Sequence, residues 1–524
     1  MKKTVFGLVS LLLVIVLFTG CSKSNNGGSA EGSQDGSGIA TTTPAGSTTG
    51  STMKEEHTIS FLNYSLPSWP YDKEWLVWKL LKEKTGVTLD VQVPSGELND
   101  ALNLTVASGN MPDMMLTLES ELAKKFGDQG ALVNILEYVE KDLPNFAKFM
   151  EKYPTLIQNT LTADGKLYMF PSEGLGVTNA MIYLYRKDIF DKHQLQQPQT
   201  WDELHAVLKK LKELYPDSYP LTFRNGLDKL LNIAPSFETG DKYYYDFDKN
   251  EWRYAPVEDN YKKMVEYLRT FVKEGLIPPD FLSIDTKQWQ DIISTNRAFI
   301  TIDYIGRIDF FNKSMRQENP DFNLTFMPTP AGWKGGKALN AFTQIDESGI
   351  MVSSTSKQID DVMKFIDYLY TEEGRDLVSW GQEGTTYKDI GDGKKEFTGG
   401  YMDLTDLQKK TGLATYGSNL WFNPDAIIAL ASPELKAAYE LTPKFVDKQQ
   451  PKPAFTPEEV LILTTTGQEI DKFRLENISK FVLGTQSMED WNQYVTNLQK
   501  LGVDKILSMY KTAYERGLES GSAE

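Results

Sequence analysis

Beyond residue 55 the pattern of apolar and polar positions changes repeatedly from the two-residue period of a strand to the 3.6-residue period of a helix. The change predicts strands followed by helices. Residues 59–63 form a short apolar run, and residues 87–93 alternate apolar and polar side chains, as a half-buried strand does. Between them, residues 74–83 place apolar side chains at helical spacing. The pattern therefore predicts a βαβ unit and a sheet that is mostly parallel.

The same alternation continues after this unit. Residues 98–107 are predicted to form a helix that stops at Gly109, and residues 111–116 an apolar strand. Ligands of open sheets bind beyond the carboxyl ends of the strands. The loops at 63–69 and 117–121 are therefore the first candidates for a binding site.

The second half of the chain follows the same style and ends in helices. Thr200 and Glu203 have the spacing of a capping box, which predicts a helix start. Apolar residues beyond Pro457 recur at helical intervals, and we interpret them as packing faces. Further predicted elements are strands at 164–171, 180–185 and 298–302, a hairpin around 246–250, and helices at 260–274, around Lys364 and around Glu458.

The N-terminus has the pattern of a secretion signal. Lys2 and Lys3 precede an apolar run too short to span a bilayer of about 30 Å, and the run ends at Cys21, the one cysteine of the chain. Residues 18–21 resemble the lipobox of bacterial lipoproteins, which implies cleavage after residue 20 and lipidation of Cys21. An uncleaved anchor with an incidental cysteine is the alternative. Either interpretation predicts a protein held at a membrane.

The residues after Cys21 predict a tether followed by a large folded region. Residues 21–54 are almost entirely small and polar, so they cannot form a core. The remaining chain is longer than one hydrophobic core usually serves, and it contains no visible repeat. We therefore predict two lobes.

Charge and cysteine content exclude several classes of protein. The formal charge of −17 argues against nucleic acid as a partner, and no cysteine remains to form a disulfide with Cys21. The three histidines are not paired at the spacing of metal ligands, and nucleophile, P-loop and dinucleotide motifs are missing. We predict no cofactor and no metal. A glycosidase stays open, because it needs only two carboxylates that the fold brings together.

One segment imitates the start of a calcium loop. Asp246, Asp248 and Asn250 have the right spacing, but Glu251 stands where glycine is needed and Val257 where the bidentate acid belongs. A hairpin turn is the preferred interpretation.

Several sequence motifs, taken together, resemble those of the extracellular solute-binding proteins of family 1. These are the capture lipoproteins of carbohydrate ABC importers, and the resemblance is strongest to their larger Lpl-type members. The resemblance runs over nearly all of the mature domain and is carried by residues 107–113, 164–171, 185–188 with 198–203, and 380–387. It implies an α/β, two-lobe periplasmic-binding-protein-like fold with crossing hinge strands and a largely helical C-terminal region. The implied lobes are residues 55–177 with 343–389, and residues 178–342 with 390–524.

The resemblance also implies a clamshell site between the lobes and a set of ligand contacts. Trp69 and Trp421 are the preferred stacking residues, because no periodic apolar face includes them. Relatives that bind acidic oligosaccharides often have a calcium loop after the helix that begins near 200, whereas residues 215–220 are short here and contain one acid. No calcium is expected there. The implied contacts are Asn63, Tyr64, Trp69, Thr117, Glu119, Thr178, Asn179, Phe237, Glu238, Asp303, Tyr304, Trp380, Glu383 and Trp421.

The function implied is capture of an oligosaccharide by closure of the lobes and delivery to the permease subunits of an ABC importer. The expected protein is a monomer, lipid-anchored on the extracellular face of the cell membrane, and not an enzyme. The alternatives are a lipid-anchored glycoside hydrolase, a binding protein for peptides, and a sensory protein.

Overall fold

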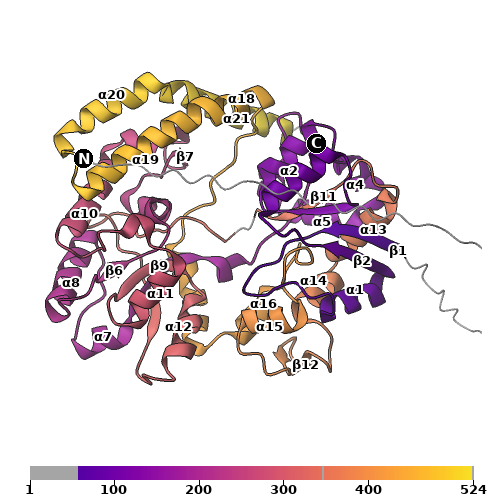
Figure 1. Ribbon diagram of the computed structural model, residues 1–524, viewed down its shortest axis with the longest axis horizontal. Helices are drawn as coiled ribbons and strands as arrows, with labels where there is room; N and C mark the ends of the chain where they lie inside the picture. The colour runs from indigo at the N-terminus through magenta and orange to yellow at the C-terminus, as the bar shows by residue number, and fades with distance from the viewer. Residues whose placement is uncertain (1–56, 345–346, 522–524) are drawn as a thin grey trace, which may run out of the picture. The chain divides into compact units, whose positions relative to one another are not determined.

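The computed structural model describes residues 57–344 and 347–521, which belong to one compact unit (Figure 1). The predicted signal peptide, the lipidation site Cys21 and the tether lie outside the described residues. Within the described part of the chain, none of the helices combines the length and apolar character needed to cross a bilayer.

The first sheet has five strands in the order β2-β1-β3-β11-β4. The predicted βαβ unit is confirmed, since β1 pairs in parallel with both β2 and β3. β11 pairs antiparallel with β3 and β4, because it enters the sheet after the chain returns from the second lobe, so the prediction of parallel strands fails there. The strands are β1 (His57–Leu62), β2 (Val87–Gln92), β3 (Met114–Thr117), β4 (Phe170–Pro171) and β11 (Gly349–Val352).

Helices cover this sheet and complete the first lobe. β3 is buried at all four positions, as a strand covered on both faces must be. Three of the helices, α5, α6 and α16, begin with a proline at their first position, where its missing N–H costs nothing. The helices are α1 (Leu76–Thr85), α2 (Leu98–Ser108), α3 (Ser120–Asp128), α4 (Leu136–Asp142), α5 (Pro144–Lys152), α6 (Pro154–Thr160), α13 (Ile359–Leu369), α14 (Glu372–Trp380), α15 (Leu404–Thr411) and α16 (Pro424–Leu430), with the small hairpin β12 (Tyr387–Asp389) and β13 (Lys395–Phe397).

The second sheet has the order β10-β5-β9-β6, with β5 antiparallel to both neighbours and β6 parallel to β9. The predicted cap of α8 is confirmed, because the Thr200 hydroxyl accepts the Glu203 N–H. The Glu203 carboxylate accepts the N–H of Gln199 instead of completing a capping box. The elements of this lobe are β5 (Met181–Arg186), β6 (Leu221–Thr222), β9 (Ile300–Tyr304), β10 (Leu324–Met327), α7 (Lys187–Lys192), α8 (Trp201–Leu214), α9 (Leu230–Ile233), α10 (Asp259–Lys273), α11 (Thr286–Ser294), α12 (Arg307–Met315), α17 (Pro433–Leu441), and the hairpin β7 (Tyr243–Asp246) and β8 (Glu251–Tyr254).

The C-terminal region is helical, as predicted, and packs on the second lobe (yellow in Figure 1). Trp491, Tyr494 and Leu498 are buried in the core of that lobe, so their interpretation as a packing face is confirmed. The helices are α18 (Pro457–Ile462), α19 (Gln468–Leu483), α20 (Trp491–Leu501) and α21 (Val503–Gly521).

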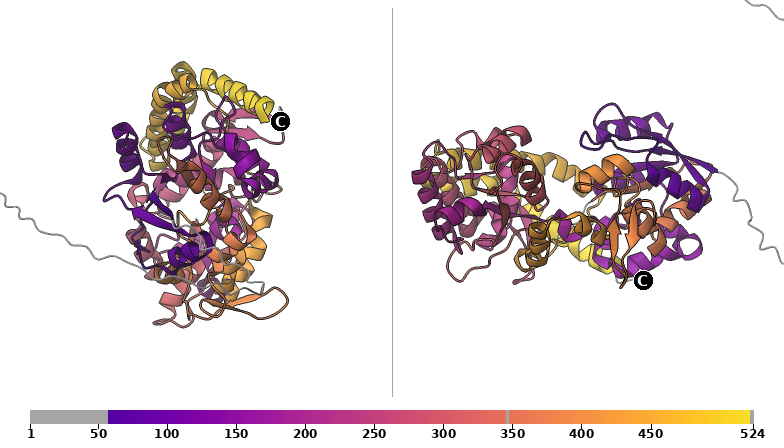
Figure 2. Two further views of the ribbon diagram at one scale, coloured as in Figure 1. Left: turned by 90° about the vertical axis from the view of Figure 1, so that its right-hand side faces the viewer. Right: turned by 90° about the horizontal axis from the view of Figure 1, so that it is seen from below.

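Two separate cores define the lobes, which lie side by side in the right-hand view of Figure 2. The first contains residues from Ile59 to Phe170 and from Ile350 to Leu420, and the second contains residues from Ala180 to Met327 and from Ala431 onward. The chain therefore crosses between lobes three times. The predicted boundaries at 177 and 342 fall within the first two crossings. The third change of core falls between Leu420 and Ala431, not at 389, because Leu407 and Leu413 pack against the first core.

Candidate functional site

A cavity of about 770 Å³ lies between the lobes, within the range typical of ligand pockets. We call it the interlobe cavity. Its residues come from the first lobe, from the second lobe, from the crossing between Met327 and Ile350, and from the segment 447–452. A ligand held here would touch both lobes.

The first-lobe wall is formed by α3, α6 and the end of β4. It contributes Ser120, Leu156, Asn159, Thr160, Met169 and Pro171. The Asn159 side-chain oxygen accepts the backbone N–H of Lys452 at 3.1 Å, which joins this wall to the segment 447–452. The Ser120 hydroxyl and the Asn159 amide nitrogen are buried and have no hydrogen-bond partner among the described residues. The first-lobe wall therefore contains, just beneath its surface, two polar atoms that are unpartnered within the described chain.

The second-lobe wall is dominated by the hairpin β7–β8, which we call the tyrosine hairpin (residues 243–254). Three consecutive tyrosines form β7 and line the cavity together with the turn residues 246–249. Tyr243 stacks on Tyr510 of α21, with ring centroids 4.6 Å apart, and Tyr245 packs on Tyr514 at 5.0 Å. The C-terminal helix thus holds the hairpin in place. Rigid aromatic side chains of this kind suit ligands that are apolar on one face and polar on another.

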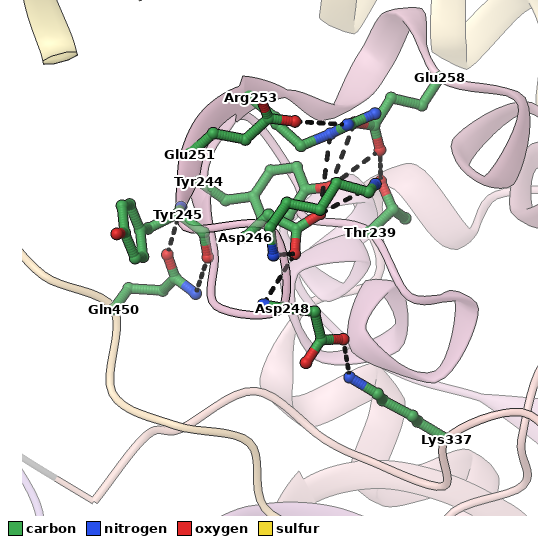
Figure 3. Close-up of polar contacts among 11 residues, drawn as sticks. Thr239, Tyr244, Tyr245, Asp246, Asp248, Glu251, Arg253, Glu258, Lys337 and Gln450 are labelled. Atoms are coloured by element: carbon green, nitrogen blue, oxygen red, sulfur yellow. Dashed lines mark hydrogen bonds and ion pairs between the residues drawn. The ribbon is translucent and has the colours of Figure 1, made fainter.

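Hydrogen bonds to the Glu258 carboxylate hold Tyr244, the middle tyrosine of the hairpin, in place (Figure 3). The Tyr244 hydroxyl donates to the Glu258 carboxylate at 3.0 Å, and Thr239 and Arg253 donate to the same carboxylate at 2.5 Å. Burial and the Glu258 charge raise the pKa of Tyr244, so the hydroxyl remains a donor. Gly240 allows the ring to approach, because a Cβ there would lie 2.5 Å from it.

The turn of the hairpin is closed by its own aspartate. Asp246 accepts the backbone N–H groups of Asp248 and Lys249, both at 3.1 Å, and pairs with the Lys249 ammonium at 3.1 Å. Burial alone would raise the pKa of Asp246, but these contacts outweigh it and lower the pKa. The segment that imitates a calcium loop is therefore a hairpin, as predicted. Among the described residues no group of three or more His, Cys, Asp or Glu side chains is placed to hold a metal ion.

Two contacts tie the hairpin to other cavity-lining segments, one at Gln450 and one at Lys337 (Figure 3). The backbone N–H of Tyr245 donates to the Gln450 side-chain oxygen at 2.7 Å, and the Gln450 amide donates back to the Tyr245 carbonyl at 3.3 Å. Lys337 forms an ion pair with Asp248. The hairpin wall is thus bonded to two other chain segments that line the same cavity.

A second, smaller hollow of about 190 Å³ lies beside α12, α15 and α17. Thr178 and Tyr304 line it together with Arg307 and Asp309. Next to it, Asp303 is buried and accepts from Arg224 at 2.7 Å and from Arg307 at 3.0 Å. Burial alone would raise the pKa of Asp303, but the two guanidinium groups outweigh it and lower the pKa. This aspartate already has a full set of partners.

Of the fourteen residues predicted to contact ligand, Glu238 lines the interlobe cavity, and Thr178 and Tyr304 line the smaller hollow. The other eleven line neither. Three of them have hydrogen bonds that explain their positions: Asn63 donates to the Tyr416 carbonyl, Thr117 donates to the Glu119 carbonyl, and Asn179 donates to the Thr343 carbonyl. Trp69, Phe237, Asp303 and Trp380 are buried, Tyr64 and Trp421 are half-buried, and Glu119 and Glu383 are exposed elsewhere.

Trp421, one of the two preferred stacking residues, has its ring occupied by the protein. The Lys152 ammonium lies 4.8 Å and the Arg375 guanidinium 4.9 Å from the ring centroid. Trp69, the other, packs against Trp75 and Tyr416. Surrounding prolines and polar residues do not distinguish a stacking tryptophan from one that packs in a local aromatic cluster.

Sequence reasoning missed the tyrosine hairpin as a site, although it predicted the hairpin itself. The available signal was the run of three tyrosines directly before the turn. In a strand, neighbouring side chains point to opposite faces, so such a run covers both faces with aromatic rings. The segment 447–452 carried no comparable signal.

Solved structures share this two-lobe architecture. The crystal structure of the alginate-binding protein AlgQ2 without calcium has a TM-score of 0.73 at 22% identity, covering 88% of this chain and 99% of that one. The substrate-binding protein FusA of S. pneumoniae, in complex with kestose, has a TM-score of 0.71 at 19% identity, with the same coverage. The predicted fold class is therefore confirmed.

Curated relatives and a family model match the sequence. Lipoprotein LipO of Bacillus subtilis is 23% identical over 97% of this chain and 98% of its own length. The polygalacturonan/rhamnogalacturonan-binding protein YtcQ of the same organism is 24% identical, over 84% of this chain and 88% of its own. The model of the family described as bacterial extracellular solute-binding protein matches residues 71–376. Because this match covers more than half of the chain, the protein belongs to the bacterial extracellular solute-binding proteins, a family of binding proteins rather than enzymes.

Proposed function

We propose that this protein captures an oligosaccharide in the interlobe cavity and delivers it to the permease subunits of an ABC importer. The observation that carries the proposal is the cavity itself, which is lined by both lobes and by consecutive tyrosines. Tyrosine rings stack on the apolar faces of sugar rings, and carboxylates such as Glu238 accept hydrogen bonds from sugar hydroxyls. FusA, named as a fructooligosaccharide ABC transporter substrate-binding protein, supports the same class of ligand.

Closure of the lobes would complete the site and signal occupancy. Ligand contacts on both walls favour the closed form, because only that form satisfies both sets of contacts. We propose Glu238, the tyrosine hairpin and the segment 447–452 as the contacts in this cavity, with Thr178 and Tyr304 on the neighbouring hollow. The remaining predicted contacts lie elsewhere, as described above.

The proposal is tested by asking whether the protein binds an oligosaccharide without changing it chemically. The full-length chain is incubated with a panel of oligosaccharides while thermal unfolding, tryptophan fluorescence and reducing ends are followed. A ligand at a hundred times its Kd should add about 2.7 kcal/mol to the stability of the folded state. Release of new reducing ends would contradict the proposal, and so would the absence of any shift across the panel.

A matched pair of variants assigns the binding to the cavity. Glu238→Gln should weaken binding by about tenfold, the effect of one lost charge-assisted hydrogen bond of about 1.4 kcal/mol. Glu213→Gln removes a similar charge from the surface of α8 and should leave the Kd unchanged. Equal effects of the two substitutions would place the sugar outside this cavity.

The anchor and cellular location are part of the same proposal. Lipidation of Cys21 would hold a monomer on the extracellular face of the membrane, and the name of the relative LipO is consistent with that. In cells fed labelled palmitate, the wild-type chain should carry label, and Cys21→Ala should carry none and appear in the medium. Label in the variant would exclude Cys21 as the attachment site.

A further inference from the structure

The charged groups on the wall of the interlobe cavity are predominantly acidic. Seven carboxylates and five lysines line it, and no arginine of the described chain does. The carboxylates are Asp228, Glu238, Asp241, Asp246, Asp248, Glu347 and Asp447, and the lysines are Lys242, Lys249, Lys337, Lys448 and Lys452. The wall therefore lacks the planar, bidentate donor that best recognises a carboxylate.

Four of the five lysines are already neutralised by the protein. Lys242 pairs with Asp471 at 2.9 Å, and Lys249 pairs with Asp246 at 3.1 Å. Lys337 pairs with Asp248, and Lys452 with Glu347.

The fifth lysine is also close to protein groups. The Lys448 ammonium lies 5.1 Å from the ring centroid of Phe247, and its charge lowers the pKa of the adjacent Asp447. Burial has the larger effect on Asp447 and raises that pKa overall. A negatively charged ligand would have to compete with carboxylates for four of the five lysines, and the fifth, Lys448, lies beside Phe247 and Asp447.

Two of the carboxylates remain open to a ligand. Asp228 and Glu238 are exposed and form no ion pair with the described residues. Glu238 accepts the backbone N–H of Lys337 at 3.3 Å through one oxygen, which leaves its other oxygen available. Ionised carboxylates are acceptors only, so the groups they bind best are hydroxyl donors.

From this distribution of charge we infer that the ligand is an uncharged oligosaccharide and not a polyuronate. The inference rests on the proposed function and narrows its class of substrate. A uronate would bring negative charge beside unneutralised carboxylates in a site from which closure removes water. The hydroxyls of a neutral sugar instead donate hydrogen bonds to those carboxylates, and its ring faces stack on the tyrosine hairpin.

Ligands that differ only in charge test the inference. Titration calorimetry of the full-length chain compares each oligouronate in the panel with its methyl ester, alongside neutral oligosaccharides of the same length. The tightest ligand should be neutral, and each ester should bind at least about tenfold tighter than its free acid, a difference of about 1.4 kcal/mol. A free acid that binds tighter than its ester would overturn the inference while leaving sugar capture intact. If no sugar of either kind binds, the proposed function itself fails, and the inference fails with it.

A substitution that frees one lysine provides an independent measurement. Asp248→Asn leaves Lys337 without its ion-pair partner, and because Asp248 is exposed the substitution should leave the fold intact. This variant should gain about threefold in affinity for an oligouronate, and the gain should disappear at high salt because the charge is screened. Glu396→Gln removes one carboxylate from the distant β12–β13 hairpin and should produce no gain. No difference between the two variants would contradict the assignment of Lys337 as a neutralised cation.

Discussion

Gln450 pairs its side-chain amide with both backbone groups of Tyr245, with bonds of 2.7 and 3.3 Å. The Gln450 amide thereby forms with Tyr245 the pair of hydrogen bonds that the backbone of a neighbouring strand would form. Because Gln450 belongs to the segment that also contacts Asn159 of the first lobe through Lys452, the hairpin and the opposite wall share one connection. Movement of that segment must change the position of the tyrosines.

Gln450→Leu removes both hydrogen bonds at similar side-chain volume. The bonds are exposed, so the free energy of unfolding should fall by less than about 1 kcal/mol. The affinity for sugar should fall about three- to tenfold, because a hairpin that is no longer held must be ordered on binding. Chemical denaturation and calorimetry measure the two effects. Gln493→Leu, on the surface of α20, is the control, and a loss of affinity there would contradict the argument.

The neighbouring tyrosines Tyr243 and Tyr244 should respond differently to the same substitution. Tyr244→Phe removes a hydroxyl bonded to the Glu258 carboxylate and should cost about 1.5 to 3 kcal/mol of stability. Tyr243→Phe removes a buried hydroxyl for which the described part of the chain offers no hydrogen-bond partner, so it should be neutral or slightly stabilising. Thermal and urea unfolding of the two variants give the comparison. Equal losses would mean that Tyr243 also has a partner in solution.

The sequence predicted the elements well because their signals are local. The capping residue Thr200 and the turn residues Asp246 and Asn250 are short-range features, and each lies where it was expected. The antiparallel entry of β11 was missed, because the direction of a strand depends on where the chain comes from and not on its own pattern. The third crossing was misplaced for the same reason, since Leu407 and Leu413 do not reveal which core they join.

The candidate site was far less predictable than the fold. The rule that ligands bind beyond the carboxyl ends of the strands points to loops. Whether a side chain in such a loop faces the cavity depends on partners distant in sequence. Asn63 bonds to Tyr416, 353 residues away, and Trp421 lies against Arg375 and Lys152. No spacing within a loop encodes such contacts.

Asp113 is the last residue of the motif 107–113, which contributed to the family resemblance, and it has a structural role. Its carboxylate accepts from the Ser60 N–H and hydroxyl at 2.9 and 2.6 Å, from Ser356 at 2.6 Å and from Gln358 at 2.9 Å. Burial alone would raise the pKa of Asp113, but these hydrogen bonds outweigh it and lower the pKa. They join β1 to the loop before α13.

Asp113→Asn should therefore lower stability by about 1 to 3 kcal/mol at pH 7, through lost hydrogen bonds to a charged acceptor. Because the folded-state pKa is depressed, the wild-type contribution is present above the unfolded value of about 3.9 and is lost as pH falls through the folded value. The difference between variant and wild type should shrink below about pH 4. Urea unfolding across this range measures it, and a difference that does not depend on pH would contradict the role of the charge.

Lys229 should destabilise the fold at neutral pH. Its ammonium is buried 3.0 Å from the Met181 sulfur, and burial lowers its pKa to about 8, with Arg224 contributing in the same direction and Asp303 opposing. Below pH 8 both folded and unfolded chains hold this proton, so the cost of burying the charge is fully present. Between about pH 8 and 10.5 the unfolded chain binds more protons than the folded one, and stability rises with pH.

Lys229→Met removes that charge at similar length and should raise stability at pH 7 by roughly 3 kcal/mol at most. The gain should decrease as pH rises from about 8 toward 10, where the wild-type lysine becomes neutral in the folded state. Urea unfolding at several pH values measures this. Lys210→Met, on the exposed face of α8, should change little at any pH. A variant less stable than wild type at pH 7 would show instead that the ammonium has a stabilising partner in this part of the second lobe.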